Sequence, residues 1–250
     1  MSNKSKNVLM ISFSLAIALL LSGCSMVVRT TDKGYKPNAN ASQAPAATGT
    51  SVTPSPSSTS DSDNEVTNAY KEVLQNNSEF YSTDNKKNIK LNDFLTNEEL
   101  YGAVFKVTHF TVLDMDGDKV PEVVLELSVG DEPQFFEVLH YMDSKVYGYL
   151  IVYRGLEALK EDGTFNFSSG AADNGAGKLS FASDSYKTDM LGYSESSQSG
   201  DNLTISYFIN NETTTKEAFD SFMNEQAAKK DAVWYEFSPE NLEAELSSNK

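Results

Sequence analysis

The sequence predicts an α+β fold, in which an antiparallel β-sheet meander with flanking helices follows a disordered tether. From Val104 to Ile209, short runs of alternating apolar and polar residues are separated by turns containing Gly, Asp and Ser, as is typical of strands in hairpins. Segments with helical spacing stand before and after most of these runs. From Ser25 to Asp63 there are too few large apolar residues to offset the entropy of ordering. We therefore expect one folded domain, over residues 64–250.

The first part of this domain is expected to be helical. Asn64 is a suitable cap for a helix that runs to Asn76. One face of this helix would carry its apolar side chains, which are Val66, Ala69, Tyr70, Val73 and Leu74. The Asn- and Lys-rich segment that follows is expected to be a loop. A second, short helix is predicted over Leu91–Tyr101, with Thr96 as its cap.

Strand patterns occupy the middle of the chain. They cover Val104–Leu113, Glu122–Val129, Gln134–Met142, Lys145–Tyr153, Thr164–Phe167, Lys178–Ala182, Tyr186–Ser194 and Leu203–Ile209. The third and fourth of these are expected to form a hairpin across Asp143–Ser144. A short helical piece is predicted over Gly155–Lys160. The Gly-rich segment Gly170–Gly177 is interpreted as a long hairpin connection, with a binding loop or lid as the alternative.

The C-terminal part is expected to return to helix. A helix is predicted over Thr215–Lys229, with a buried face formed by Ala218, Phe219, Phe222 and Met223. Trp234–Phe237 is expected to be a last strand, and Pro239 to open a terminal helical turn.

Residues 1–23 have the features of a secretory signal. Lys4 and Lys6 form a charged start, and the run of 14 uncharged residues from Val8 to Leu21 is too short to span a membrane comfortably. It ends in Leu21-Ser22-Gly23-Cys24, which resembles the lipobox of bacterial lipoproteins and contains the only cysteine of the chain. The resemblance implies cleavage before Cys24 and attachment of lipid to its thiol. The alternatives are an ordinary signal peptide or a buried free cysteine.

The lipoprotein resemblance implies a location on the outer face of a bacterial cell membrane. An anchor of two or more acyl chains holds far more firmly than one chain. Residues 24–63 would begin with the lipidated cysteine and continue as the tether, whose 39 residues after Cys24 give a root-mean-square span on the order of 30 to 40 Å. Using Cys24 for lipid leaves the domain without a disulfide.

The charge of the chain narrows the class of partner. Its formal net charge is −16, and removal of the signal, which contains two lysines and no acid, makes it −18. Nucleic acids are bound through basic patches, so this charge disfavours them as partners. It favours cations.

The stretch from Asp114 to Glu122 is the most distinctive part of the domain. Asp114, Asp116 and Asp118 occupy positions 1, 3 and 5 of a loop, the carbonyl of Val120 position 7 and Glu122 position 9. Oxygen donors at this spacing suit a hard cation such as calcium. Three alternating aspartates and a glutamate would also repel one another without a positive charge among them. The alternative is an acidic hairpin turn without an ion.

This loop resembles the Asp-x-Asp-x-Asp calcium loops of EF-hands, dockerins and FG-GAP propeller repeats, over about a dozen residues. Position 6 is Lys119 instead of glycine, and position 12 is Leu125 instead of the bidentate glutamate of an EF-hand. The flanks have strand patterns, so the likeness is greater to FG-GAP repeats, whose last ligand falls at position 9. We expect a structural calcium ion with a dissociation constant of about 0.1 to 1 mM, as in extracellular modules.

No catalytic residue is predicted. The two histidines, His109 and His140, stand in strand patterns and are interpreted as ordinary, hydrogen-bonded strand residues. The sequence has no Gly-x-Ser-x-Gly or His-Glu-x-x-His motif and no phosphate-binding loop. A pair of carboxylates could still support glycoside hydrolysis.

The sequence therefore favours a membrane-anchored binding or interaction module over an enzyme. Its partners would be the membrane, through the lipid, and a protein, peptide or glycan ligand. The alternative is a cell-envelope hydrolase of glycan or peptide that calcium stabilises.

Overall fold

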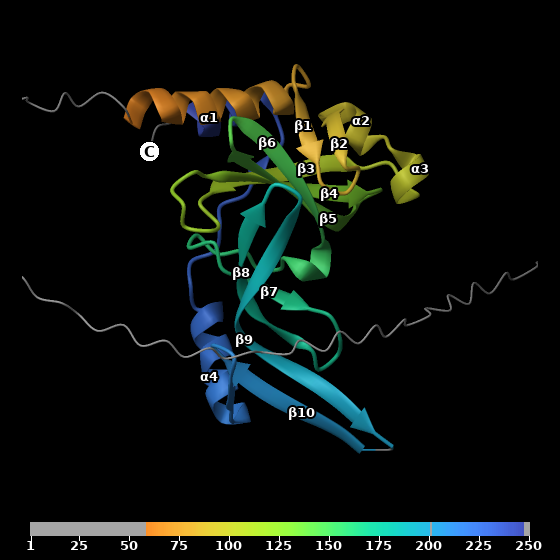
Figure 1. The fold of residues 1–250 in the computed structure, drawn as a ribbon, viewed down its shortest axis with the longest axis vertical. Coiled ribbons are helices and arrows are strands. Elements are labelled where there is room, and N and C mark those ends of the chain that lie inside the picture. Colours follow the sequence, from red (N-terminus) through yellow and green to blue (C-terminus); the bar gives the residue numbers. More distant parts are fainter. Residues whose placement is uncertain (1–58, 201, 248–250) are drawn as a thin grey trace, which may run out of the picture. The chain divides into compact units, whose positions relative to one another are not determined.

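The computed structural model describes residues 59–200 and 202–247. Cys24 and the rest of the lipobox-like segment lie outside these residues, as does the segment up to residue 58 that is predicted to be a tether. The described part is an α+β structure with two mostly antiparallel sheets and few helices, which confirms the predicted fold class (Figure 1). None of its helices combines the length and the apolar character that crossing a membrane requires.

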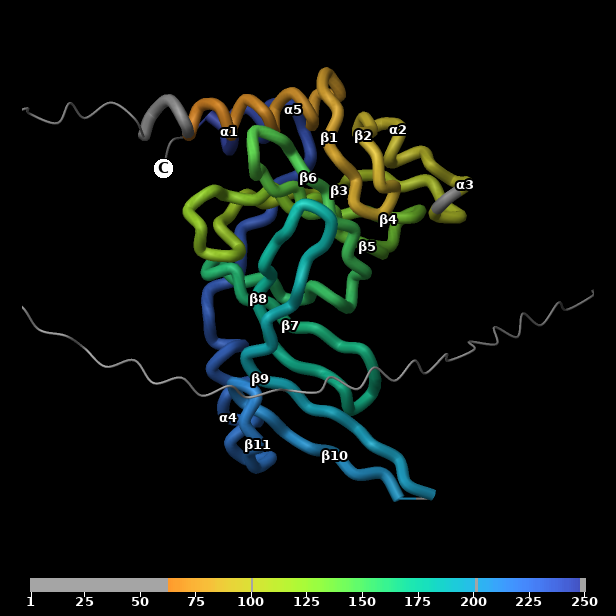
Figure 2. Tube along the Cα trace, in the orientation of Figure 1, coloured from red at the N-terminus to blue at the C-terminus, as the bar shows by residue number. Residues whose placement is uncertain are grey.

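The elements follow one another along the chain as traced in Figure 2. The helices are α1 (Thr59–Leu74), α2 (Leu91–Leu95), α3 (Glu98–Tyr101), the 3-10 helix η1 (Tyr153–Gly155), α4 (Lys216–Ala227) and α5 (Pro239–Ser247). The first six strands are β1 (Glu79–Ser82), β2 (Lys87–Lys90), β3 (Lys106–Leu113), β4 (Glu122–Val129), β5 (Glu132–Met142) and β6 (Lys145–Val152). The others are β7 (Phe165–Ser168), β8 (Asn174–Ala182), β9 (Ser185–Ser199), β10 (Asn202–Ile209), β11 (Glu212–Thr214) and β12 (Tyr235–Glu236).

The strands form a seven-stranded sheet, in the order β12-β3-β4-β5-β6-β1-β2, and a five-stranded sheet, in the order β11-β10-β9-β8-β7. The meander expected from the sequence is present in β3–β6 and again in β7–β11. One pair, β1 with β6, is parallel, and the other pairs between named strands are antiparallel.

Both faces of the larger sheet are covered, which explains why β4 is a nearly continuous apolar run. On one face, Val123 and Leu125 pack in a core that includes Tyr70 of α1 and Leu242 of α5. On the other face, Val124 packs with residues of the second sheet, among them Phe165 and Leu179. The loop between β3 and β4 is thus attached to two strands that lie between two apolar cores.

Some boundaries in the first third differ from the prediction. The helix predicted from Asn64 already begins at Thr59, so Asn64 lies inside α1, although Val66 and Tyr70 are buried as expected. The predicted polar loop after it contains the hairpin β1–β2. Its buried anchors are Phe80 and Ile89. Parallel pairing of β1 with β6 incorporates this short hairpin into the large sheet.

One predicted helix is divided in two, and another is largely absent. The segment Leu91–Tyr101 forms two helices, because Thr96 ends α2 instead of starting a helix. Its hydroxyl donates to the carbonyl of Asn92 at 2.8 Å, which satisfies a carbonyl of the last turn. Over Gly155–Lys160 the chain leaves η1 and forms isolated bridges at Glu157 and Lys160 instead of a helix.

The C-terminal half also departs from the prediction in places. Asn174–Gly177, expected to be part of a long connection, begins β8, and β11 was not predicted. Thr215 caps α4 as expected, since its hydroxyl accepts the Ala218 N–H at 3.2 Å. Ala218 itself is exposed, because the buried stripe of α4 passes through Phe219 and Gln226. The predicted terminal turn at Pro239 is a full helix, α5.

Candidate metal site

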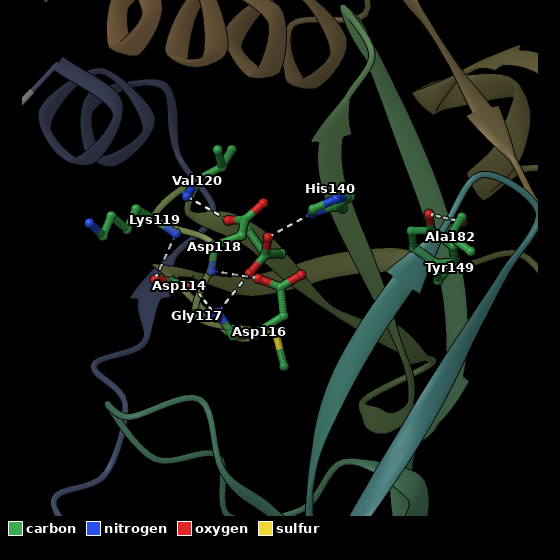
Figure 3. Close-up of polar contacts among 11 residues, drawn as sticks. Asp114, Asp116, Gly117, Asp118, Lys119, Val120, His140, Tyr149 and Ala182 are labelled. Atoms are coloured by element: carbon green, nitrogen blue, oxygen red, sulfur yellow. Dashed lines mark hydrogen bonds and ion pairs between the residues drawn. The ribbon is translucent and has the colours of Figure 1, made fainter. Parts of the chain in front are cut away.

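The loop between β3 and β4 gathers its three aspartates. One carboxylate oxygen from each of Asp114, Asp116 and Asp118 lies within 4.8 Å of the others, a separation that one cation could bridge. Figure 3 shows these side chains grouped on one side of the loop. Asp114 and Asp116 are half-buried and Asp118 is exposed. The structure therefore contains an Asp-rich cluster with the donor chemistry of a divalent-cation site.

Backbone N–H groups hold this arrangement. The two carboxylate oxygens of Asp114 accept from Gly117 N at 2.7 Å and from Lys119 N at 3.1 Å. Asp116 accepts from Asp118 N at 3.0 Å, and Asp118 from Val120 N at 2.6 Å. Such side-chain contacts to the following backbone are usual for Asp in turns. Each carboxylate oxygen keeps a further lone pair for a cation.

The left-handed conformation expected at loop position 6 is present although the residue is not glycine. Lys119 has φ +74°, and Gly117 has φ +92°. For Lys119 this conformation costs on the order of 1 kcal/mol. Between the aspartates, Met115 points the other way and is fully buried against the second sheet. The buried side chain of Met115 thus fixes the loop on its apolar side.

Glu122 is not a member of the group of three aspartates but belongs to a second group that adjoins it. It is fully buried at the start of β4, where one oxygen accepts Met115 N at 2.6 Å and the other lies 2.8 Å from Nδ1 of His140 on β5. Asp116, Glu122 and His140 form a second group whose ligand atoms lie within 4.8 Å of one another. The structure thus shows two adjoining groups that share Asp116. The carbonyl of Val120 belongs to the predicted ligand set, but only its N–H has a described contact.

Burial and charge shift the titration of this second group. Burial raises the pKa of Glu122 to about 7, against the lowering effect of its hydrogen bonds to His140 and Met115 N. Burial alone would lower the pKa of His140, but the hydrogen bond and negative charge of Glu122, followed by Asp116 and Asp118, raise it overall. Burial also raises the pKa of Asp116. The contact between His140 and Glu122 therefore lies in a buried position in which each group shifts the pKa of the other.

The two histidines, treated alike in the sequence, have different surroundings. His109 is partly exposed on β3, and its Nδ1 lies 2.9 Å from Glu126. His140 is buried beside the aspartate cluster and stacks on Phe181 of the second sheet, with ring centroids 4.7 Å apart. The predicted hydrogen bonds of both side chains are present. The position of His140 next to Asp116 and Glu122 was not predicted.

A groove lies elsewhere, between α1, β1 and the β5–β6 turn, with a volume of about 510 Å³. Its lining includes the half-buried rings of Tyr81 and Tyr141, and Tyr141 donates a hydrogen bond to Glu65 at 2.8 Å. Glu72 and Lys145 also contribute. Aromatic faces together with hydrogen-bonding groups suit a peptide or a sugar.

Comparisons of the chain with protein-family models, with curated proteins and with solved structures gave no match.

Proposed function

We propose that the chain is a lipid-anchored, extracytoplasmic binding module of a bacterial cell surface, and that a calcium ion stabilises its central sheet. The observation that carries the metal part is the convergence of Asp114, Asp116 and Asp118. Their mutual repulsion needs a positive charge. Lys119 is the nearest base in the sequence, but Figure 3 shows its ammonium directed away from the three carboxylates.

Calcium is the ion that this donor set fits best. Asp114, Asp116 and Asp118 offer only oxygen, and the Val120 carbonyl stands at the position where such loops contribute a backbone ligand. Glu122, at position 9, is held by Met115 N and His140. We expect Glu122 to act through a bridging water, which is the common mode at that position.

Calcium should raise the melting temperature of the chain. With a dissociation constant of about 0.1 to 1 mM, 10 mM calcium would add about 1.4 to 2.7 kcal/mol to the free energy of unfolding. This corresponds to roughly 3 to 10 °C for a domain of this size. Asp118→Asn keeps the carbonyl-type oxygen that accepts Val120 N but removes the charge, so the gain should be lost. Differential scanning calorimetry of both chains, in calcium and in chelator, measures this rise in melting temperature.

The control is Asp131→Asn, which removes the same charge from an exposed turn between β4 and β5. It should keep the full response to calcium. In chelator, Asp118→Asn should be at least as stable as the unmodified chain, since one repelling charge is gone. An unmodified chain whose melting temperature ignores calcium would refute the metal part of the proposal.

The membrane part is supported by the Leu21-Ser22-Gly23-Cys24 sequence and by the tether-like composition that follows. Metabolic labelling with an alkyne fatty acid should mark the chain in the membrane fraction. Cys24→Ser should remove the label, because a hydroxyl is not the nucleophile that the thiol is. Immunoblots of equal samples control for expression. Unlabelled, unmodified chain free in the medium would exclude the anchor.

The groove beside α1 supports a binding role. Its tyrosines and carboxylates can stack on and hydrogen-bond to a peptide or glycan. We expect soluble glycan–peptide fragments of the cell wall to shift the NMR signals of groove residues. Tyr81→Ala should weaken binding at least about tenfold, as for loss of a stacking anchor. Tyr186→Ala, at a partly exposed tyrosine on β9, is the control and should bind normally. Shifts elsewhere, or none, would argue against this role.

A further inference from the structure

A second set of metal-ligating atoms lies behind the aspartate loop. Asp116, Glu122 and His140 bring one ligand atom each within 4.8 Å of one another. They come from the loop, the first residue of β4 and the C-terminal part of β5. Unlike the aspartates alone, this group contains a nitrogen donor, and two of its three members are buried. Its chemistry therefore differs from that of the predicted calcium loop.

We propose that Asp116, Glu122 and His140 form a second cation site, which takes a transition metal ion of borderline softness such as Zn²⁺ and shares Asp116 with the calcium loop. Imidazole nitrogen suits Zn²⁺ and related ions, whereas calcium prefers oxygen alone. Two carboxylates and one imidazole leave the fourth tetrahedral position for water.

The geometry needs only a small adjustment. Nδ1 of His140 and Oε1 of Glu122 are 2.8 Å apart. Two ligands of tetrahedral zinc, each about 2.1 Å from the metal, are about 3.4 Å apart. A change of about 0.6 Å is within the reach of side-chain rotation. Met115 N, which donates to the other Glu122 oxygen at 2.6 Å, would hold the carboxylate in place as an outer-shell contact.

The two groups can be tested separately through the residues that they do not have in common, although Asp116 belongs to both and Glu122 is also expected to reach the calcium through a water. Asp114 and Asp118 belong only to the first group, and Glu122 and His140 only to the second. The chain has just two histidines, and His109 serves as a matched control. It also lies on a strand of the large sheet with Nδ1 against a glutamate, but it is partly exposed and stands outside both groups.

The test is ¹⁵N NMR of the full chain labelled at histidine, chelated, then returned to excess calcium and titrated with Zn²⁺. One equivalent should move the ring nitrogens of His140 and leave those of His109 unchanged. The signals that disappear in the spectrum of His109→Gln belong to His109, so the remaining ones are assigned to His140. This substitution does not disturb the buried site. Cys24 cannot produce this readout, because only imidazole nitrogens are observed.

Calorimetry completes the test. We expect one Zn²⁺ to bind at the Asp116–Glu122–His140 site of each chain. Its affinity should fall at least about tenfold in His140→Gln. In His109→Gln and Asp118→Asn the affinity should be unchanged. Zn²⁺ that moves neither histidine, or only His109, would overturn the proposal, as would equal affinity in a folded His140→Gln. If His140→Gln does not fold, the NMR spectrum of the unmodified chain tests the proposal, through the presence or absence of a Zn²⁺-induced shift of the His140 ring nitrogens. The calcium response of Asp118→Asn is measured separately, so failure of one site is distinguishable from failure of the other.

Discussion

Gly148→Ala should be strongly destabilising, by about 3 kcal/mol or more, because the position has no room for a methyl group. Gly148 lies on β6 opposite Leu139 of β5. A Cβ atom there would stand 2.2 Å from Oε1 of Glu137 and 2.4 Å from the ring of Phe80. Both side chains are buried in the core that joins β1 to the large sheet, so neither can move into solvent. Overpacking of this kind forces the backbone to shift.

Urea unfolding of the two chains at neutral pH measures this loss. Gly130→Ala provides a graded comparison, because Gly130 has φ +64° but open space around it. That change should cost only on the order of 1 kcal/mol, from backbone strain alone. If Gly148→Ala is no more destabilising than Gly130→Ala, the packing of β1 and Phe80 against β6 is not as described.

Glu137→Met should instead stabilise the chain at neutral pH, by about 1 to 4 kcal/mol. Glu137 is fully buried on β5, between Leu125 of β4 and Leu150 of β6. Neither of its carboxylate oxygens has a hydrogen-bond partner among the described residues. An unpartnered buried carboxylate is costly, and methionine fills a similar volume with apolar atoms. The same substitution at the exposed Glu132, also on β5, should change stability little.

The pH dependence identifies the cause of this gain. Burial, reinforced by the charge of Asp84, raises the pKa of Glu137 above the ordinary carboxyl value of 4.5. The folded chain therefore retains a proton that the unfolded chain releases above about pH 4.5. The stability that the neutral acid allows is present below this pH and is lost as the pH rises toward the folded pKa. The advantage of Glu137→Met should grow between pH 4 and pH 8. An advantage that is flat with pH, or a loss at pH 7, would contradict the burial of an unpaired acid.

Local pattern was sufficient to predict strand β4, which follows the aspartate loop, and the β5–β6 hairpin. The strand Glu122–Val129 has the predicted bounds. The hairpin across Asp143–Ser144 forms as expected, and both turn residues have positive φ, at +53° and +59°. This is the turn geometry that matches the twist of two-residue hairpins. Strong alternation and a short turn determine such elements within a few residues, so distant contacts are not needed.

Elements stabilised by distant contacts could not be predicted in this way. β1 and β2 have four residues each, and each has only one large buried side chain, Phe80 or Ile89. What incorporates them into the sheet is the parallel pairing of β1 with β6, across a long intervening segment. Parallel pairing leaves no local turn signal in the sequence. The segment therefore looks like a polar loop until the sheet is known.

In the candidate metal site, too, the features set by neighbouring residues were predictable and those set by distant contacts were not. The spacing of Asp114, Asp116 and Asp118 predicted their convergence, because turn hydrogen bonds between neighbouring residues produce it. The meeting of Glu122 with His140 was not predictable. The β4–β5 register shifts at an irregularity between Leu127 and Ser128. Such a shift changes which residues face each other, and the sequence does not reveal it.

The central claim is that the Asp114–Glu122 loop holds a divalent cation. A crystal structure of the chain grown with 10 mM calcium tests it most directly. We expect an ion at about 2.3 to 2.6 Å from oxygens of Asp114, Asp116 and Asp118 and from the Val120 carbonyl. Carboxylates that bind only their own backbone N–H groups and water at that calcium concentration would contradict it.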